Sequence, residues 1–224
     1  VDASLPAHGT VLEQMGSIAS SLFGEGLLEG NRAHYYAVEN SVLHRVLQTG
    51  KGIPITLAII AIEVGRRLNI PLQGVGFPFH FLVKHEGRTD FFIDAFNHGR
   101  ILSIDDCRET LRTASNGNVP FEMAQLQPVS PRQILVRMLN NLKGIYLRAN
   151  DIPRAIAASE RILCLRPDQL GELRDRGLMH LKQGTFQLAV DDLSAYLDQN
   201  GDIPDRETVE RHLEHAKEHL KTLH

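Results

Sequence analysis

Two residues suited to acid–base chemistry, His80 and Asp94, lie in neighbouring segments rich in Phe and Val. We predict a strand over 74–84 that carries His80 and a second over 91–96 that carries Asp94, joined by a turn over 85–90. If His80 and Asp94 pair across this hairpin, the Asp94 carboxylate orients the His80 imidazole. A cysteine at a helix N-terminus would then complete the site, because the helix dipole favours the thiolate form. The pattern therefore points to acyl transfer or amide hydrolysis, provided that a nucleophile is present.

A helix that begins after Gly-Lys-Gly precedes the two strands and is expected to run from Pro54 to about Leu68. Proline suits the first helical position, where its missing N–H would be unpaired anyway, but it has no group that can attack a substrate. Thr56 is an alternative nucleophile, although a hydroxyl needs strong activation and a first-turn threonine more often bonds the exposed backbone. Cys107 and Cys164 fall on other predicted helices and do not substitute plausibly.

The rest of the N-terminal part is expected to position this pair with helices and a small sheet. Helix signals cover about 9–22 and 41–48, the second with Asn40 as a plausible N-cap. Ser103 should cap another helix, because Asp106 stands three residues on in the capping-box position. Helices followed by an antiparallel sheet indicate an α+β domain.

The C-terminal part repeats itself after 34 residues, the period of the tetratricopeptide helix–turn–helix unit. Asn150 and Gly184 fall where the turn between two helices needs a residue that tolerates a positive φ. Pro167 follows the first unit and stops its second helix. The aligned positions include Leu139 with Leu173, Leu147 with Leu181, Ala155 with Ala189, and Leu163 with Leu197.

One more helix is expected over 206–221, as the polar-backed cap that a short repeat stack needs. Three histidines, His212, His215 and His219, share one of its faces. We interpret this face as solvated rather than as a metal site, because no cysteine or carboxylate is clearly placed to complete it. The sequence therefore predicts no metal and no cofactor.

Composition narrows the class of protein further. The 224 residues are 42% hydrophobic and 23% charged, which is ordinary for a globular protein, and the net charge of −3 lacks the basic excess of a nucleic-acid binder. No apolar run reaches the roughly 18–20 residues that a membrane span needs. Two cysteines do not make a disulfide framework, and residues 1–25 lack a signal-peptide pattern. These features favour a cytoplasmic protein that binds neither nucleic acid nor membrane.

Four stretches together resemble the bacterial SirB-type family, which joins a transglutaminase-like, papain-like domain to C-terminal tetratricopeptide repeats. They are YYAVENSVLHRVL, GKGIPITLAIIAIEVGRRLNIP, GVGFPFHFLVK and FFIDAFNHGRILS. Transglutaminase-like enzymes read G-x-C-x-x-x-A at the helix start, where this sequence has Gly-Ile-Pro-Ile-Thr-Leu-Ala over 52–58. The resemblance therefore implies that Pro54 replaces the nucleophile, and that Phe79 replaces a glycine before His80 and narrows any cleft.

The expected architecture is an α+β transglutaminase-like domain over 1–114, a linker over 115–132, and an all-α domain over 133–224 with two repeats and a capping helix. The proline-rich linker should be irregular and exposed. In this scheme His80 and Asp94 are the remnants of a triad. A structural alternative makes His80 a buried histidine that holds two strands in register.

Two functions follow, and the sequence favours the first. In the first, the chain is a non-catalytic interaction or regulatory protein whose repeats bind a partner protein or peptide, possibly acidic. The residues expected on or near the concave face of the repeats are Arg137, Asn140, Arg148, Arg174 and Lys182. In the second, the chain is a hydrolase or acyltransferase that uses His80 and Asp94 with a nucleophile other than cysteine. If the first domain fills the repeat groove, these arginines form intramolecular ion pairs instead.

Overall fold

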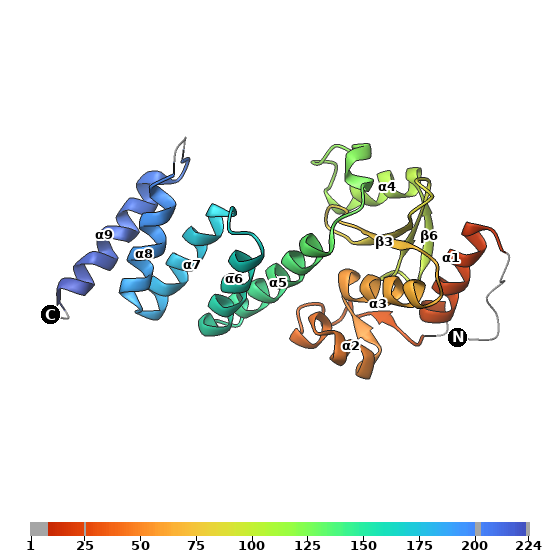
Figure 1. The fold of residues 1–224 in the computed structure, drawn as a ribbon, viewed down its shortest axis with the longest axis horizontal. Coiled ribbons are helices and arrows are strands. Elements are labelled where there is room, and N and C mark those ends of the chain that lie inside the picture. The colour runs from red at the N-terminus through yellow and green to blue at the C-terminus, as the bar shows by residue number, and fades with distance from the viewer. Residues whose placement is uncertain (1–8, 25, 200–202, 223–224) are drawn as a thin grey trace. The chain divides into compact units, whose positions relative to one another are not determined.

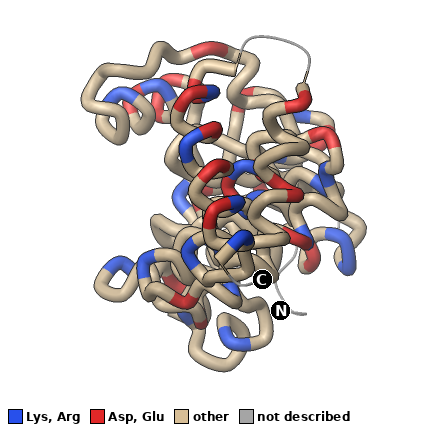
Figure 2. The backbone as a smooth tube through the Cα atoms, turned by 90° about the vertical axis from the view of Figure 1, so that its left-hand side faces the viewer, with Lys and Arg blue, Asp and Glu red and all other residues tan. Residues whose placement is uncertain are grey.

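A computed structural model describes residues 9–24, 26–199 and 203–222 (Figure 1). The chain divides into two compact units, Val1–Ile134 and Leu135–His224. Unit 1 combines helices with a small antiparallel sheet, and unit 2 is helical. The fold class is therefore the predicted one. Lysine, arginine, aspartate and glutamate are interspersed along the chain and not sorted into long blocks (Figure 2).

Unit 1 begins with helices whose ends follow from local side-chain bonds. The Thr10 hydroxyl and the Glu13 carboxylate cap the first helix reciprocally. Asn40 is not the N-cap that the sequence suggested: its amide bonds the carbonyl oxygens of His34 and Tyr35, and the second helix starts after Val42. The helices are α1 (Val11–Ala19), continued by a π-turn over Ser20–Gly24, the 3₁₀ turn Val38–Ser41, α2 (Leu43–Thr49) and α3 (Pro54–Arg67).

The main sheet has four antiparallel strands in the order β3-β4-β5-β6. The strand predicted over 74–84 is interrupted, because residues 76–81 form a loop between β3 and β4. Two residues explain the break: Pro78 lacks the N–H that a strand needs, and Phe79 has a φ of 59°. The strands are β3 (Leu72–Val75), β4 (Leu82–His85), β5 (Phe91–Asp94) and β6 (Arg100–Ser103). A separate parallel pair joins β1 (Glu29–Gly30) to β2 (Lys51–Gly52).

Helix α4 (Ile104–Ala114) packs on this sheet, and the expected capping box of Ser103 and Asp106 is present. The segment 115–132 is largely irregular and exposed, but part of it joins the core of unit 1. Leu126 is 3% exposed and joins the core around the sheet, and Pro128 forms a bridge with Val75 of β3. Val119 and Phe121 pack partly buried against the same core, so this irregular segment is attached to the sheet by apolar contacts.

Unit 2 follows the 34-residue period. Asn150 and Gly184, with φ values of 56° and 81°, end the first helix of each pair in the left-handed conformation that the sequence predicted. Ala155 and Ala189 are fully buried where the paired helices approach. The helices are α5 (Pro131–Arg148, which starts in unit 1), α6 (Ile152–Leu165), α7 (Leu170–Gln183), α8 (Phe186–Leu197) and α9 (Arg206–Thr222). None of the helices described is both long and apolar enough to cross a membrane.

Candidate functional site

His80 and Asp94 meet in unit 1, as the hairpin pattern predicted. Pairing of Val83 with Ile93 brings the start of β4 beside the end of β5, where Asp94 is the last strand residue. His80 lies in the loop before β4 rather than on a strand. Its Nε2 is 2.7 Å from Oδ1 of Asp94, and the two side chains are only 10% and 3% exposed. The pair is therefore buried and oriented.

The Asp94 carboxylate has further partners in the turn that follows β5. The backbone N–H of Asn97 donates to Oδ1 at 3.1 Å, and the Asn97 amide donates to Oδ2 at 2.5 Å. Burial alone would raise the pKa of Asp94. The hydrogen bond from His80, the charge interaction with His80 and the two bonds from Asn97 together outweigh burial and lower the pKa of Asp94 below its ordinary value. Asp94 is thus a fixed anion that orients His80.

Arg32 extends this network to the surface. Its guanidinium donates to Oδ1 of Asn97 and lies 5.3 Å from the centroid of the Phe96 ring. Gly30 lets this segment approach, because a Cβ there would stand 2.5 Å from the Phe96 carbonyl oxygen. Sequence analysis missed Arg32, which is distant along the chain and belongs to no motif.

An aromatic surface borders the pair. Phe96 lies edge-on to His80 with ring centroids 6.2 Å apart, and Tyr35 is edge-on to Phe96 at 5.9 Å. Phe79 is 63% exposed and adopts a left-handed φ that favours glycine, the residue which the resemblance places there. The phenyl ring therefore adds exposed apolar area beside His80 rather than filling the core.

The start of α3 offers no activated nucleophile. Pro54 is its buried first residue. The fully buried Thr56 hydroxyl accepts from the Ile53 N–H at 3.1 Å and lies 2.8 Å from the Asn40 carbonyl oxygen, to which it donates. Burial, with the charges of Asp106 and Asp94, raises the pKa of the Cys107 thiol to about 12. Cys164 is exposed on α6 of unit 2.

Of the five residues expected on the repeat face, Arg174 is held within unit 2. It pairs with Asp175 at 2.6 Å and with Asp205 at 2.8 Å. Arg137 and Asn140 lie on α5 and are half-buried. Arg148 and Lys182 are exposed near the ends of α5 and α7, at the same position of the two repeats.

Beside this face, Lys143 forms a buried network that the sequence did not reveal. Its ammonium lies 2.7 Å from Oε1 of Glu172, which is 2% exposed and also accepts a bond from Ser159. Lys143, Ser159 and Glu172 come from α5, α6 and α7, so the network ties three helices together.

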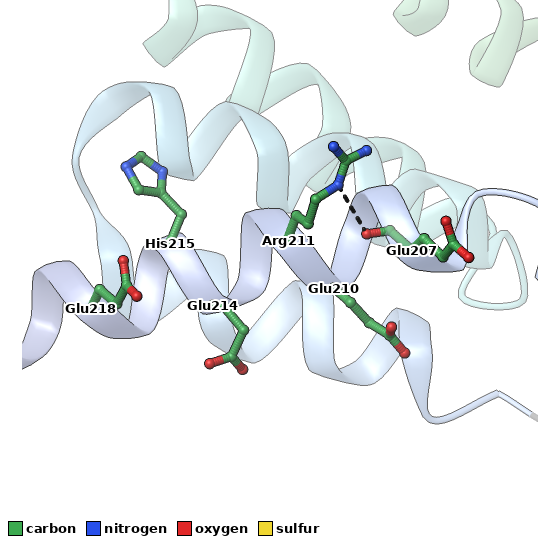
Figure 3. Close-up of a pocket in the computed structure, with 6 residues that line it drawn as sticks. All are labelled: Glu207, Glu210, Arg211, Glu214, His215 and Glu218. Atoms are coloured by element: carbon green, nitrogen blue, oxygen red, sulfur yellow. Dashed lines mark hydrogen bonds between the residues drawn. The ribbon is translucent and has the colours of Figure 1, made fainter.

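The histidines of α9 do not converge on one point. Nε2 of His215 and Nε2 of His219 are 3.0 Å apart, and the His219 ring stacks on Phe186, whereas Nδ1 of His212 bonds the Thr208 carbonyl oxygen. Within the described ranges, no three histidine, cysteine or acidic side chains are grouped as a metal site. Figure 3 shows the outer face of α9, an open hollow of about 610 Å³ lined by Glu207, Glu210, Arg211, Glu214, His215 and Glu218.

Comparison with known proteins agrees with both units. Residues 1–140 match the transglutaminase-like superfamily model, and residues 142–214 match a tetratricopeptide repeat model. A UPF0162 protein of Xylella fastidiosa (strain 9a5c) is 43% identical over 188 residues, which cover 82% of this chain and 67% of that protein. The chain therefore belongs to the transglutaminase-like superfamily and to the UPF0162 family.

More distant relatives share parts of this architecture. A UPF0162 protein of Vibrio cholerae is 29% identical over 171 residues, covering 75% of this chain and 63% of that protein. F-box only protein 21 of Mus musculus is 34% identical over 136 residues, covering 57% of this chain but only 21% of that protein. No solved structure matches the chain.

Proposed function

We propose that this chain is a non-catalytic protein-interaction protein, in which a transglutaminase-like unit serves as scaffold and the repeat unit binds a partner. One observation supports the proposal: α3 begins with Pro54, where the resemblance places the nucleophile, and neither Thr56 nor Cys107 among the described residues offers an activated group in its place. The Thr56 hydroxyl is engaged by backbone groups. The neutral, buried Cys107 thiol belongs to the sheet core.

The repeat unit supports the binding half of the proposal. Tetratricopeptide helices expose side chains at repeated positions, and Arg148 and Lys182 occupy the same position of the two repeats. Both are exposed cations, so a partner segment that carries carboxylates would form charge-assisted bonds with them. Arg174 pairs with Asp175 and Asp205 within unit 2.

A quantitative pull-down from bacterial lysate, read by mass spectrometry, tests this proposal. Wild type would be compared with Arg148→Glu/Lys182→Glu, and with Arg108→Glu/Arg112→Glu as a control that reverses two exposed helical charges in unit 1. We expect one near-stoichiometric protein to be lost only in the first variant. If folded wild type retains nothing above background, or if both variants lose the protein equally, the proposal fails.

The competing proposal is a hydrolase or acyltransferase that uses His80 and Asp94 with a non-cysteine nucleophile. It is favoured by the 2.7 Å contact within the pair and by the fixed negative charge of Asp94. A positioned water or a substrate group would then supply the attacking atom. His80→Ala separates the two proposals, since an enzyme loses turnover while it still binds its substrate.

The finer assignments remain part of this proposal. We propose membership of the SirB-type family on the four sequence stretches that resemble it. We also propose a bacterial, cytoplasmic protein without nucleic-acid partners, supported by its bacterial relatives, its two free cysteines and its net charge of −3.

A further inference from the structure

The first repeat has a groove that the proposed function does not use. Helices α5 and α6 enclose a cavity of about 300 Å³ lined mainly by apolar side chains. We call the lining residues the α5–α6 face: Leu139, Leu142, Tyr146, Ala157 and Ala158, with the exposed Arg154 and Arg161. A cavity of this size, largely apolar with a few polar groups, is typical of a binding site.

The equivalent residues of the second repeat indicate what kind of element packs on such a face. A shift of 34 residues carries Leu142, Tyr146 and Ala158 onto Arg176, His180 and Asp192. In the second repeat, helix α7, which carries Arg176 and His180, packs against α6 (Figure 1). The second repeat thus has a helix packed on this side, whereas the first repeat lies at the N-terminal end of unit 2 and has no earlier repeat helix there among the described residues.

The α5–α6 face and the equivalent face of the second repeat differ in polarity, and this difference indicates which kind of helix the first one binds. In the second repeat, Asp192 neutralises Arg176 through two bonds of 2.7 Å. The first repeat has Leu142 and Ala158 there, so its groove floor is apolar. An apolar floor buries apolar side chains of an incoming helix, each of which contributes about 1.5–3 kcal/mol when fully buried.

The two arginines supply the charge. Arg161 donates to the Ala157 carbonyl oxygen and has no carboxylate partner in the described part of the chain. Arg154 lies 3.3 Å from Asp151 and 5.8 Å from the Tyr146 ring centroid, with its side chain 70% exposed. They stand seven positions apart on α6, which is about 10.5 Å along a helix. Carboxylates two turns apart on the occupant would meet both.

From these observations we propose that the α5–α6 face binds an amphipathic helix of a partner protein, with an apolar stripe flanked by aspartate or glutamate. The inference rests on the proposed function, because it states which kind of partner the repeat unit binds and where. A second copy of this chain is a poorer occupant. The outer face of its α9 carries four glutamates but lacks an apolar stripe (Figure 3).

A labelled synthetic peptide provides the probe. The peptide has the sequence of residues 151–166 with the substitutions R154E, R161E and C164S. This segment is chosen because α6 packs on the equivalent side of the second repeat. Its neutral twin has Gln at the two Glu-substituted positions. Fluorescence anisotropy would measure binding of both peptides to the full wild-type chain, to Arg154→Glu/Arg161→Glu, and to the control Arg108→Glu/Arg112→Glu.

We expect wild type and control to bind the acidic peptide, with about ten-fold weaker binding of the neutral twin and about ten-fold weaker binding by Arg154→Glu/Arg161→Glu. Equal affinity for the two peptides, unchanged binding by that variant, or no binding at about 1 mM peptide would overturn the inference. So would concentration-dependent sedimentation of wild type that the same variant abolishes, since the occupant would then be a second copy.

The pull-down separates this inference from the proposed function. If Arg148→Glu/Lys182→Glu loses the cellular partner while Arg154→Glu/Arg161→Glu retains it, the repeats still bind a partner, but not through the α5–α6 face. If the partner is lost with Arg154→Glu/Arg161→Glu and its contact segment is an acidic amphipathic helix, the inference holds.

Discussion

Unit 1 and unit 2 both bury charged side chains, but their networks join different parts of the fold. In unit 1, the buried pair of His80 and Asp94 continues through Asn97 to the exposed Arg32. In unit 2, Glu172 accepts bonds from Lys143 and Ser159 between three helices, and Lys143 also lies 3.5 Å from Oδ2 of the partly exposed Asp175. The network of unit 1 thus connects the loops around the sheet, whereas the network of unit 2 holds helices together.

The largest expected effect comes from breaking the network of unit 2. Lys143→Met leaves the Glu172 carboxylate buried without its cation, which should lower the free energy of unfolding of unit 2 by about 3–5 kcal/mol. Hydrogen exchange of the α5 and α7 amides would measure the loss. Lys143→Met/Glu172→Leu removes both charges and should recover most of the stability. If the single variant is as stable as wild type, the network does not hold the helices together.

The next effect concerns the pair of unit 1. Asp94→Asn weakens three bonds to the carboxylate and should destabilise unit 1 by about 1–3 kcal/mol. Asp90→Asn, in the exposed turn before β5, is the matched control and should have little effect. Hydrogen exchange in β4 and β5 reports the difference. Equal stabilities of the two variants would show that Asp94 has no structural role.

The stability difference between wild type and Asp94→Asn should change with pH in one direction. Because the folded pKa of Asp94 is lowered, the stability that its charge contributes is fully present above the ordinary aspartate value of 3.8 and is lost as the pH falls through the folded pKa. The difference in unfolding free energy between wild type and Asp94→Asn should therefore shrink as the pH falls below 3.8. A difference that grows as the pH falls below this value would contradict the assignment.

The smallest effect is expected at Phe79. A non-glycine residue with a φ of 59° is strained, so Phe79→Gly should stabilise unit 1 by about 0.5 kcal/mol, as strain relief exceeds the added freedom of the unfolded chain. Phe79→Ala keeps a Cβ atom and should not gain this stability. Thermal unfolding of the two variants compares them, and a more stable alanine variant would exclude backbone strain as the cause.

Features that depend on local interactions were predicted from the sequence, whereas contacts between distant segments were not. Periodicity and capping residues predicted α3, α4, the repeat turns at Asn150 and Gly184, and the meeting of His80 with Asp94. The loop over 76–81 was missed because the alternation of Phe and Val outweighed Pro78. Arg32 and the partners of Lys143 were missed because contacts between distant segments depend on packing, which one sequence does not display.

The burial of Leu126 within the segment 115–132 was not predicted for a related reason. Prolines and small polar residues over 115–132 correctly indicated irregular backbone, but they do not tell whether such a segment packs. The apolar residues Val119, Phe121 and Leu126 are scattered without a period, and the core around the sheet supplies the surface on which they pack. Irregular structure and exposure are therefore separate properties of a segment.

The central claim is that unit 1 does not transform what the chain binds. The most direct measurement incubates the captured partner with wild type, His80→Ala and Asp94→Asn in parallel, and then determines its intact mass. We predict the same mass in all three samples. Cleavage, deamidation or cross-linking of the partner by wild type, absent with His80→Ala, would show that His80 and Asp94 are catalytic and would contradict the account.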